Sequence, residues 1–126
     1  MCLLDGVIDW NDESITCVSE THRDPNNPLR SNGRLSAVHL LEYGAQAGAV
    51  HGGLRARAAG QTAPPGYLAA LRDAHLHVTR VDNIAAPLQV RAKRLFGETV
   101  NSVYECEISA DGKTLARGRV TIILRN

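Results

Sequence analysis

Apolar and polar side chains alternate with a period of two residues along several segments, and this pattern predicts β-strands. The clearest example is segment 113–125, where a small or apolar row from Ala116 to Leu124 alternates with a row that includes Arg117 and Arg119. Successive side chains of a strand point to opposite faces of a sheet, so we expect one face of this segment to be buried. Similar patterns predict five further strands, at residues 3–10, 15–21, 67–82, 88–96 and 102–109.

Turn-forming residues separate these segments. Asp111-Gly112 lies between two β-rich runs and is a strong hairpin signal. Residues 11–14, Asn-Asp-Glu-Ser, join the first two predicted strands in a second hairpin. Segment 22–33 contains two prolines and an Asn-Gly pair, which indicate an ordered loop rather than a helix.

One segment, from Ala37 to about Ala59, has helical spacing and contains no proline. Ser36 precedes it as a helix N-cap, and Leu35 and Leu40 have the positions of a hydrophobic staple. Glycine and alanine are frequent in this segment, although each interior glycine costs about 1 kcal/mol relative to alanine. A sequence accepts that cost where another backbone approaches closely, so we expect a central helix covered by a curved sheet.

The element order predicts the fold class and the need for a partner surface. Two strands, one helix and four strands in succession favour an α+β fold with an antiparallel sheet. The length of 126 residues is that of a single domain, residues 1–126. One helix cannot cover both faces of such a sheet, so we expect a free face or edge to form a dimer interface.

Composition excludes several classes of function. A net charge of +1 and an aromatic content of 4% argue against nucleic-acid binding. Uncharged stretches such as 43–54 are too short to span a membrane, and no signal-peptide pattern opens the chain. The three cysteines, Cys2, Cys17 and Cys106, lie far apart, so we expect free thiols in a reducing cytoplasm, with Cys17 and Cys106 as small core residues.

The helical segment carries a family resemblance. Residues 34–53, RLSAVHLLEYGAQAGAVHGG, resemble the central helix of the hotdog-fold 3-hydroxyacyl-acyl-carrier-protein dehydratases, in which a Glu is followed one turn later by a Gln, here Glu42 and Gln46. The opening MCLLDGV and the ending LARGR at 115–119 are similar to the branch of that family linked to aryl-polyene pigments. The resemblance implies a hotdog fold, in which a five- or six-stranded antiparallel sheet wraps one long central helix.

The resemblance also implies an activity. The family dehydrates a 3-hydroxyacyl thioester on the phosphopantetheine of an acyl carrier protein, in fatty-acid or aryl-polyene-type pigment biosynthesis. It needs no cofactor or metal and uses a Glu and a His that meet across a dimer interface. Glu42 matches the carboxylate. The family's G-H-F-P loop is replaced here by Asn27-Pro28-Leu29-Arg30, so His22 is our candidate for the imidazole. The family's His-containing lead-in is also missing, which a late start codon or a truncation would explain.

Further residues are assigned from their positions. Gln46 follows Glu42 by one turn and is expected to orient it or to contact substrate. His39 shares the helix with Glu42 and is expected to contact substrate or to serve as an alternative catalytic partner. The substrate is expected to lie beside Gly48. His51 is expected to make a polar contact or a cap.

The remaining polar residues are assigned more broadly. His75 and His77 share one face of a strand, but the sequence places no third ligand, so we expect no metal site. Basic residues of the C-terminal half are candidates for contact with an acidic carrier protein: Arg91, Lys93, Arg94, Arg117 and Arg119.

Two alternatives stay open. The absence of the loop His favours a non-catalytic subunit that binds acyl carrier protein and completes a hotdog dimer with a catalytic partner. An acyl thioesterase is the other alternative, because hotdog thioesterases also use a carboxylate on this helix. A homodimer and a hotdog heterodimer both fit the dehydratase interpretation.

Overall fold

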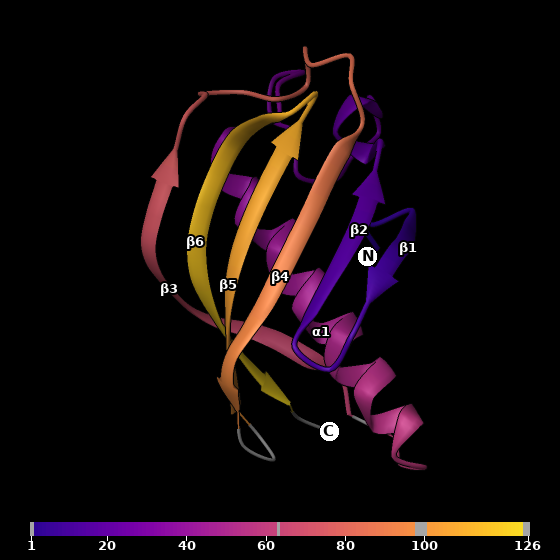
Figure 1. The fold of residues 1–126 in the computed structure, drawn as a ribbon. Helices are drawn as coiled ribbons and strands as arrows, with labels where there is room; N and C mark the ends of the chain where they lie inside the picture. Colours follow the sequence, from indigo (N-terminus) through magenta and orange to yellow (C-terminus); the bar gives the residue numbers. More distant parts are fainter. Residues whose placement is uncertain (1, 63, 98–100, 125–126) are drawn as a thin grey trace.

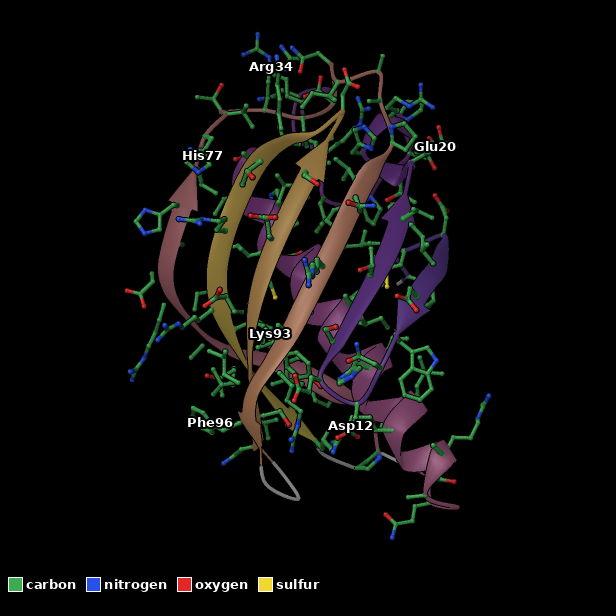
Figure 2. All side chains as sticks on the ribbon, in the orientation of Figure 1. Asp12, Glu20, Arg34, His77, Lys93 and Phe96 are labelled. Carbon is green, nitrogen blue, oxygen red and sulfur yellow. The ribbon has the colours of Figure 1, made fainter. Side chains whose placement is uncertain are left out.

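A computed structural model describes residues 2–62, 64–97 and 101–124 of the chain. In these ranges one long helix lies along the concave face of a six-stranded antiparallel sheet that curves around it (Figure 1). The expected α+β arrangement, with a central helix and five or six antiparallel strands, is therefore confirmed. Side chains fill the space between the helix and the sheet (Figure 2).

The elements follow the chain in the predicted order. Their bounds are β1 Gly6–Trp10, β2 Ser14–Ser19, α1 Leu40–Ala58, β3 Gly66–Leu76, β4 Leu88–Gly97, β5 Asn101–Ala110 and β6 Lys113–Leu124, with 3₁₀ turns at Thr21–Arg23 and Ala37–His39. The strand order across the sheet is β1-β2-β4-β5-β6-β3, which places β1 and β3 at the two edges. The predicted Asp111-Gly112 hairpin joins β5 to β6, and both turn residues have the positive φ that a type I′ turn requires.

The first strand begins at Gly6 rather than at residue 3, because the backbone of Leu3 bonds to side chains. The N–H of Leu3 donates to Gln46 Oε1 at 2.7 Å. The carbonyl of Leu3 accepts from Thr21 Oγ1 at 2.8 Å and also from Ser19 Oγ. These bonds attach the start of the chain to the helix and to the end of β2.

The strand predicted at 67–82 ends at Leu76, because the residues beyond it change their pairing partner. The N–H of Val81 donates to the carbonyl of Leu35 at 2.9 Å, and the N–H of Ala37 donates to the carbonyl of Thr79 at 3.0 Å. The N–H of His77 still donates to the carbonyl of Leu115 in β6, and the segment from Thr79 to Val81 then turns toward the chain that leads into α1. Side-chain alternation alone does not reveal this change.

The helical segment begins at the predicted cap. Ser36 Oγ accepts a hydrogen bond from the N–H of Val38 at 3.3 Å. Leu35 and Leu40, the residues of the predicted staple, are both fully buried. The first turn is 3₁₀ rather than α, so regular α1 starts at Leu40 instead of Ala37.

Two helix glycines allow the sheet to approach closely. A Cβ atom at Gly44 would lie 2.8 Å from both Cβ and Sγ of Cys106, and one at Gly48 would lie 2.5 Å from Cδ1 of Ile122. Neither distance is compatible with a real side chain, so the glycine content of α1 follows from its packing on β5 and β6. Gly52 differs, because a Cβ there would meet no atom within 4 Å.

A buried histidine attaches the β1–β2 hairpin to the helix. His51 Nε2 lies 2.7 Å from the carbonyl oxygen of Asn11, and Nδ1 lies 2.6 Å from the hydroxyl of Tyr104. A carbonyl only accepts, so Nε2 carries the proton and Nδ1 accepts from Tyr104. Burial lowers the pKa of His51, which keeps the ring neutral. The expected polar contact of His51 is thus made within the core.

We predict that Gly44→Ala lowers the free energy of unfolding by about 1–3 kcal/mol, because the added Cβ overlaps an atom attached directly to the β5 backbone. The matched change Gly52→Ala should raise that free energy by up to about 1 kcal/mol, since open space surrounds the new methyl group. Urea unfolding followed by circular dichroism measures both. Equal effects of the two substitutions would contradict the close approach at Gly44.

Acid should destabilise the protein below about pH 6.5. Burial lowers the pKa of both His51 and His22 from the ordinary value of 6.5, so the unfolded chain binds protons in a range where the folded chain does not. The free energy of unfolding is therefore greatest above pH 6.5 and falls as the pH drops, by up to about 1.4 kcal/mol per pH unit for each histidine. His51→Gln should reduce this slope in urea titrations at several pH values. An unchanged slope would show that His51 does not titrate differently in the two states.

Candidate functional site

One side of α1 faces away from the sheet. Each residue turns the helix by about 100°, so Glu42 lies on the side opposite Gly44, which packs on β5. Residues near the same angular position recur at each of the next four turns. We call this set the open stripe, and each member is at least partly exposed: Glu42, Gln46, Ala49, Gly53 and Arg57.

Glu42 has an imidazole partner on its own helix. His39 Nδ1 lies 3.5 Å from Glu42 Oε1, and the two side chains are 29% and 42% exposed. A cavity of about 220 Å³ adjoins His39 and is also lined by Arg34 and Thr79. A carboxyl and an imidazole in contact beside a cavity are the groups that a general acid–base reaction needs.

His22 lies in the interior rather than on the loop surface. Its ring is fully buried, and Nε2 donates to the carbonyl of Ile84 at 2.9 Å. Nδ1 has no hydrogen-bond partner among the described residues, and burial lowers the pKa of the ring. Of the two histidines considered from the sequence, the described contacts bring His39 and not His22 to Glu42.

The other two predicted site residues make structural contacts. Gln46 Oε1 accepts from the N–H of Leu3, so this side chain holds the start of the chain beside the open stripe. Gly48 faces the sheet, where a Cβ would meet Ile122 and Tyr104. Packing therefore explains Gly48, and the groove expected beside it is filled by β5 and β6.

Tyr43 was not recognised from the sequence, although it fixes the position of the loop against α1. Its buried hydroxyl lies 2.8 Å from Thr21 Oγ1 and 3.1 Å from Asn27 Nδ2. Asn27 also donates to the carbonyl of Thr21 at 2.8 Å. These bonds attach loop 21–30 to the turn that carries Glu42. The partners lie 22 and 16 residues from Tyr43, so no local motif indicates them.

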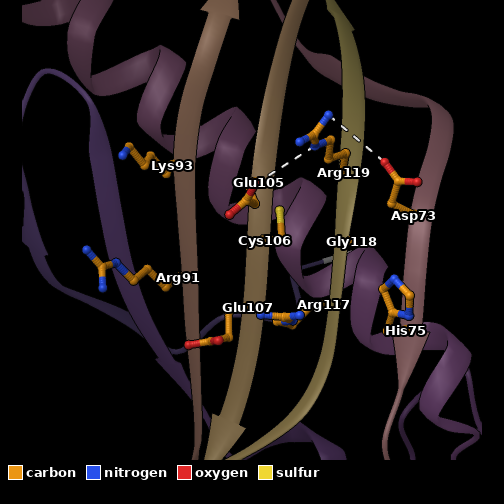
Figure 3. Close-up of a pocket in the computed structure, with 10 residues that line it drawn as sticks. All are labelled: Asp73, His75, Arg91, Lys93, Glu105, Cys106, Glu107, Arg117, Gly118 and Arg119. Carbon is orange, nitrogen blue, oxygen red and sulfur yellow. Dashed lines mark ion pairs between the residues drawn. The ribbon is translucent and has the colours of Figure 1, made fainter.

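The outer face of the sheet carries rows of opposite charge (Figure 3). Glu105 lies between Lys93 and Arg119 across β4, β5 and β6. Arg119 is 3.8 Å from Glu105 and 4.0 Å from Asp73. The next row repeats the order, with Glu107 between Arg91 and Arg117, and the face forms an open depression of about 480 Å³.

This outer face lies across the sheet from Glu42, because α1 packs on the inner face. Four of the five basic residues that we expected to contact a carrier protein are on it: Arg91, Lys93, Arg117 and Arg119. The fifth, Arg94, has a buried Nε and is set apart from them. A carrier bound here would have the sheet between its substrate and Glu42. The depression is therefore better explained by exposed cross-strand ion pairs.

The helix side of β3 is uncovered. Leu68, Leu71 and Leu76 pair with strand residues of β6 that are buried under α1, so all three leucines point to the helix side. They nevertheless remain 36%, 43% and 44% exposed. Ala49 of the open stripe lies next to the start of β3 at Gly66. The open stripe therefore meets the start of β3 at Gly66.

Within the described ranges, no helix is both long and apolar enough to cross a membrane. In the same ranges, no three side chains of the metal-binding types gather at one place. The three described cysteines are unpaired, and Cys17 and Cys106 are buried as expected. Burial raises the pKa of Cys106 to about 12, so its thiol stays protonated.

Solved structures with the same fold include dehydratases and thioesterases. A chain of the dehydratase heterocomplex ApeI:P from Xenorhabdus doucetiae aligns with this chain at 25% sequence identity and a TM-score of 0.88. The alignment covers 98% of this chain and 83% of that chain. The alignment with the thioesterase HI1161 from Haemophilus influenzae covers 95% of this chain and 77% of that chain, at 14% identity and a TM-score of 0.66. The alignment with the Escherichia coli PaaI protein covers 95% of this chain and 78% of that chain, at 13% identity and a TM-score of 0.66. The latter two likenesses concern the fold alone.

Among proteins of curated function, none matches the chain significantly. The family model of the ApeP-like proteins, described as ApeP dehydratase, matches residues 1–126. This match confirms both the resemblance carried by the helix and the expectation of a dehydratase-like protein. The chain belongs to the ApeP-like dehydratase family.

Proposed function

We propose that this chain is a subunit of a cytoplasmic dehydratase that removes water from 3-hydroxyacyl thioesters carried on the phosphopantetheine of an acyl carrier protein, in aryl-polyene-type pigment synthesis. Family membership supports the reaction class. The contact of Glu42 with His39 on the side of α1 that the sheet leaves open is the observation that carries the proposal. Family membership also favours dehydration over the hydrolysis that a thioesterase performs.

The two groups have complementary roles in the proposed reaction. A base removes one proton from C2 of the acyl chain, and an acid protonates the hydroxyl on C3, which leaves as water while the C2–C3 double bond forms. We assign the base to Glu42, beside C2, and the acid to His39, beside the hydroxyl on C3. The 3.5 Å contact between them then returns the proton from the carboxyl group to the imidazole after each turnover. The proposed proton transfers use no cofactor.

We further propose that a second hotdog subunit covers the open stripe and β3. Unpaired backbone groups at a strand edge and three exposed leucines beside it are the properties of a pairing surface. The structural relative from Xenorhabdus doucetiae is a heterocomplex, which supports a different hotdog chain as the partner. The candidate site then lies between two subunits.

A non-catalytic role is the second candidate. The buried ring of His22 favours it, because loop 21–30 then presents no exposed imidazole to a substrate. In that case the partner supplies the chemistry and this chain supplies the acyl-binding surface.

We predict that Glu42→Gln lowers kcat/KM by about 10²–10⁴-fold, because it removes the titrating group and keeps the size of the side chain. His39→Gln should have a similar effect. Both residues are partly exposed, so unfolding in urea should change little. Turnover of a 3-hydroxyacyl carrier protein to the enoyl product, followed by mass spectrometry, measures the effect with and without a second hotdog subunit.

His75→Gln is the matched control, because this exposed histidine lies on the outer face and turnover should be unaffected. His22→Asn distinguishes the two imidazoles. Lost turnover in a folded His22 variant, together with full turnover of His39→Gln, would assign the acid to His22. Undiminished turnover of Glu42→Gln would favour the non-catalytic role.

We predict that Leu71→Asp raises the dissociation constant of the oligomer by at least about tenfold, because a charge replaces an apolar side chain on the proposed interface. Ala70→Asp places the same charge on the opposite face of β3, where it pairs with Thr121, and should change assembly less. Light scattering over a range of micromolar concentrations measures both. A wild-type protein that remains monomeric with every hotdog partner would rule out this interface.

A further inference from the structure

A second cavity opens on the same side of α1 as Glu42, toward the end of the helix. Its volume is about 330 Å³. It is lined by Val50, Gly53, Leu54, Arg57, Gln61 and Thr62. We propose that this cavity holds the phosphate end of the phosphopantetheine arm and that Arg57 binds the phosphate. The proposal rests on the function proposed above and adds a position and a residue for carrier recognition.

The length of the arm fits the distance along the helix. About 15 bonds separate the phosphorus from C2 of the acyl group. One residue of an extended polypeptide has three backbone bonds and spans roughly 3.5 Å, so an extended chain advances about 1.2 Å per bond. The arm therefore spans about 18 Å. With a rise of about 1.5 Å per residue, Leu54 lies about 18 Å from Glu42 along the axis of α1.

Arg57 has the position and the charge that a phosphate requires. Its Cα lies about 22 Å from that of Glu42, and helical side chains lean toward the preceding turn, which brings its guanidinium back toward Gly53. Among the described residues, no carboxylate pairs with Arg57, whereas the neighbouring Arg55 is bound to Asp12 at 3.1 Å. An unpaired guanidinium beside a cavity is a favourable site for a phosphate.

The other two cavities do not fit the phosphate. The cavity beside His39 is too close, because His39 lies 3.5 Å from Glu42. The depression on the outer face contains Glu105, Glu107 and Asp73, and it lies across the sheet from Glu42. The cavity at Arg57 is open on the same side as Glu42 and combines the required distance with an uncompensated positive charge.

The experiment compares two thioesters of the same 3-hydroxyacyl group, one on phosphopantetheine and one on pantetheine, which lacks the phosphate. We expect wild-type protein, with its hotdog partner, to have a kcat/KM roughly 10–100-fold higher for the phosphorylated substrate. Arg57→Gln should remove this advantage, so that the two thioesters react with nearly equal kcat/KM. Arg55→Gln should retain the higher kcat/KM for the phosphorylated substrate, because the Arg55 guanidinium is already paired with Asp12.

A binding measurement separates this inference from the proposed reaction. Calorimetric titration with unreactive thioether analogues of both substrates requires no turnover. A phosphate-dependent affinity that Arg57→Gln abolishes supports the inference, even if neither thioester is dehydrated and the proposed reaction fails. Absence of a phosphate preference, or an equal loss in both arginine variants, would overturn it. A changed acyl-length preference with the phosphate advantage intact would also overturn it, since the cavity would then hold the far end of the acyl chain.

Discussion

The close approach of α1 to β5 and β6 is the constraint on which the rest of the structure depends. At Gly44 and Gly48 side chains of the sheet occupy the space of a Cβ atom, which favours the rotation of α1 that turns these two positions toward β5 and β6. That rotation turns Glu42 away from the sheet and aligns it with Ala49, Gly53 and Arg57. The glycines therefore determine, by packing alone, the direction in which the acidic group points. The polar bonds of Tyr43 then fix the same turn against the preceding loop.

The two faces of the sheet have different physical characters. On the inner face, apolar side chains and Gly118 pack under the helix. On the outer face, acidic β5 lies between basic β4 and basic β6, so each carboxylate has cations on both sides. The outer depression has the largest of the three cavity volumes, yet its charges largely neutralise one another. The smallest of the three cavities is lined by His39 and so adjoins the candidate acid and base.

Sequence reasoning predicted the fold well because the fold is determined by local patterns. Alternation located the strands, and the glycine content of 44–53 indicated a helix under close contact. The position of Glu42 came from the family resemblance. Its contact with His39 follows from helical spacing and was available as an alternative.

The rest of the site depends on contacts that leave no local pattern. The ring of His22 is buried against a carbonyl 62 residues away, and Gln46 holds a backbone N–H 43 residues away. The alternation of side chains predicted β3, but it did not predict that the leucines on its helix side stay exposed. Their exposure depends on how far α1 extends across the sheet. Such features become visible only when the whole chain is assembled.

The exposed surface of β3 has a consequence for the amount of this protein that a cell maintains. A chain that lacks the proposed second subunit presents an unpaired strand edge together with Leu68, Leu71 and Leu76. Surfaces of this kind promote aggregation and lead to removal by quality-control proteases. In the proposed assembly, the lifetime of the chain depends on the rate at which the second subunit is synthesised. Matched production of the two proposed subunits would then be a requirement that the exposed β3 surface imposes on gene expression.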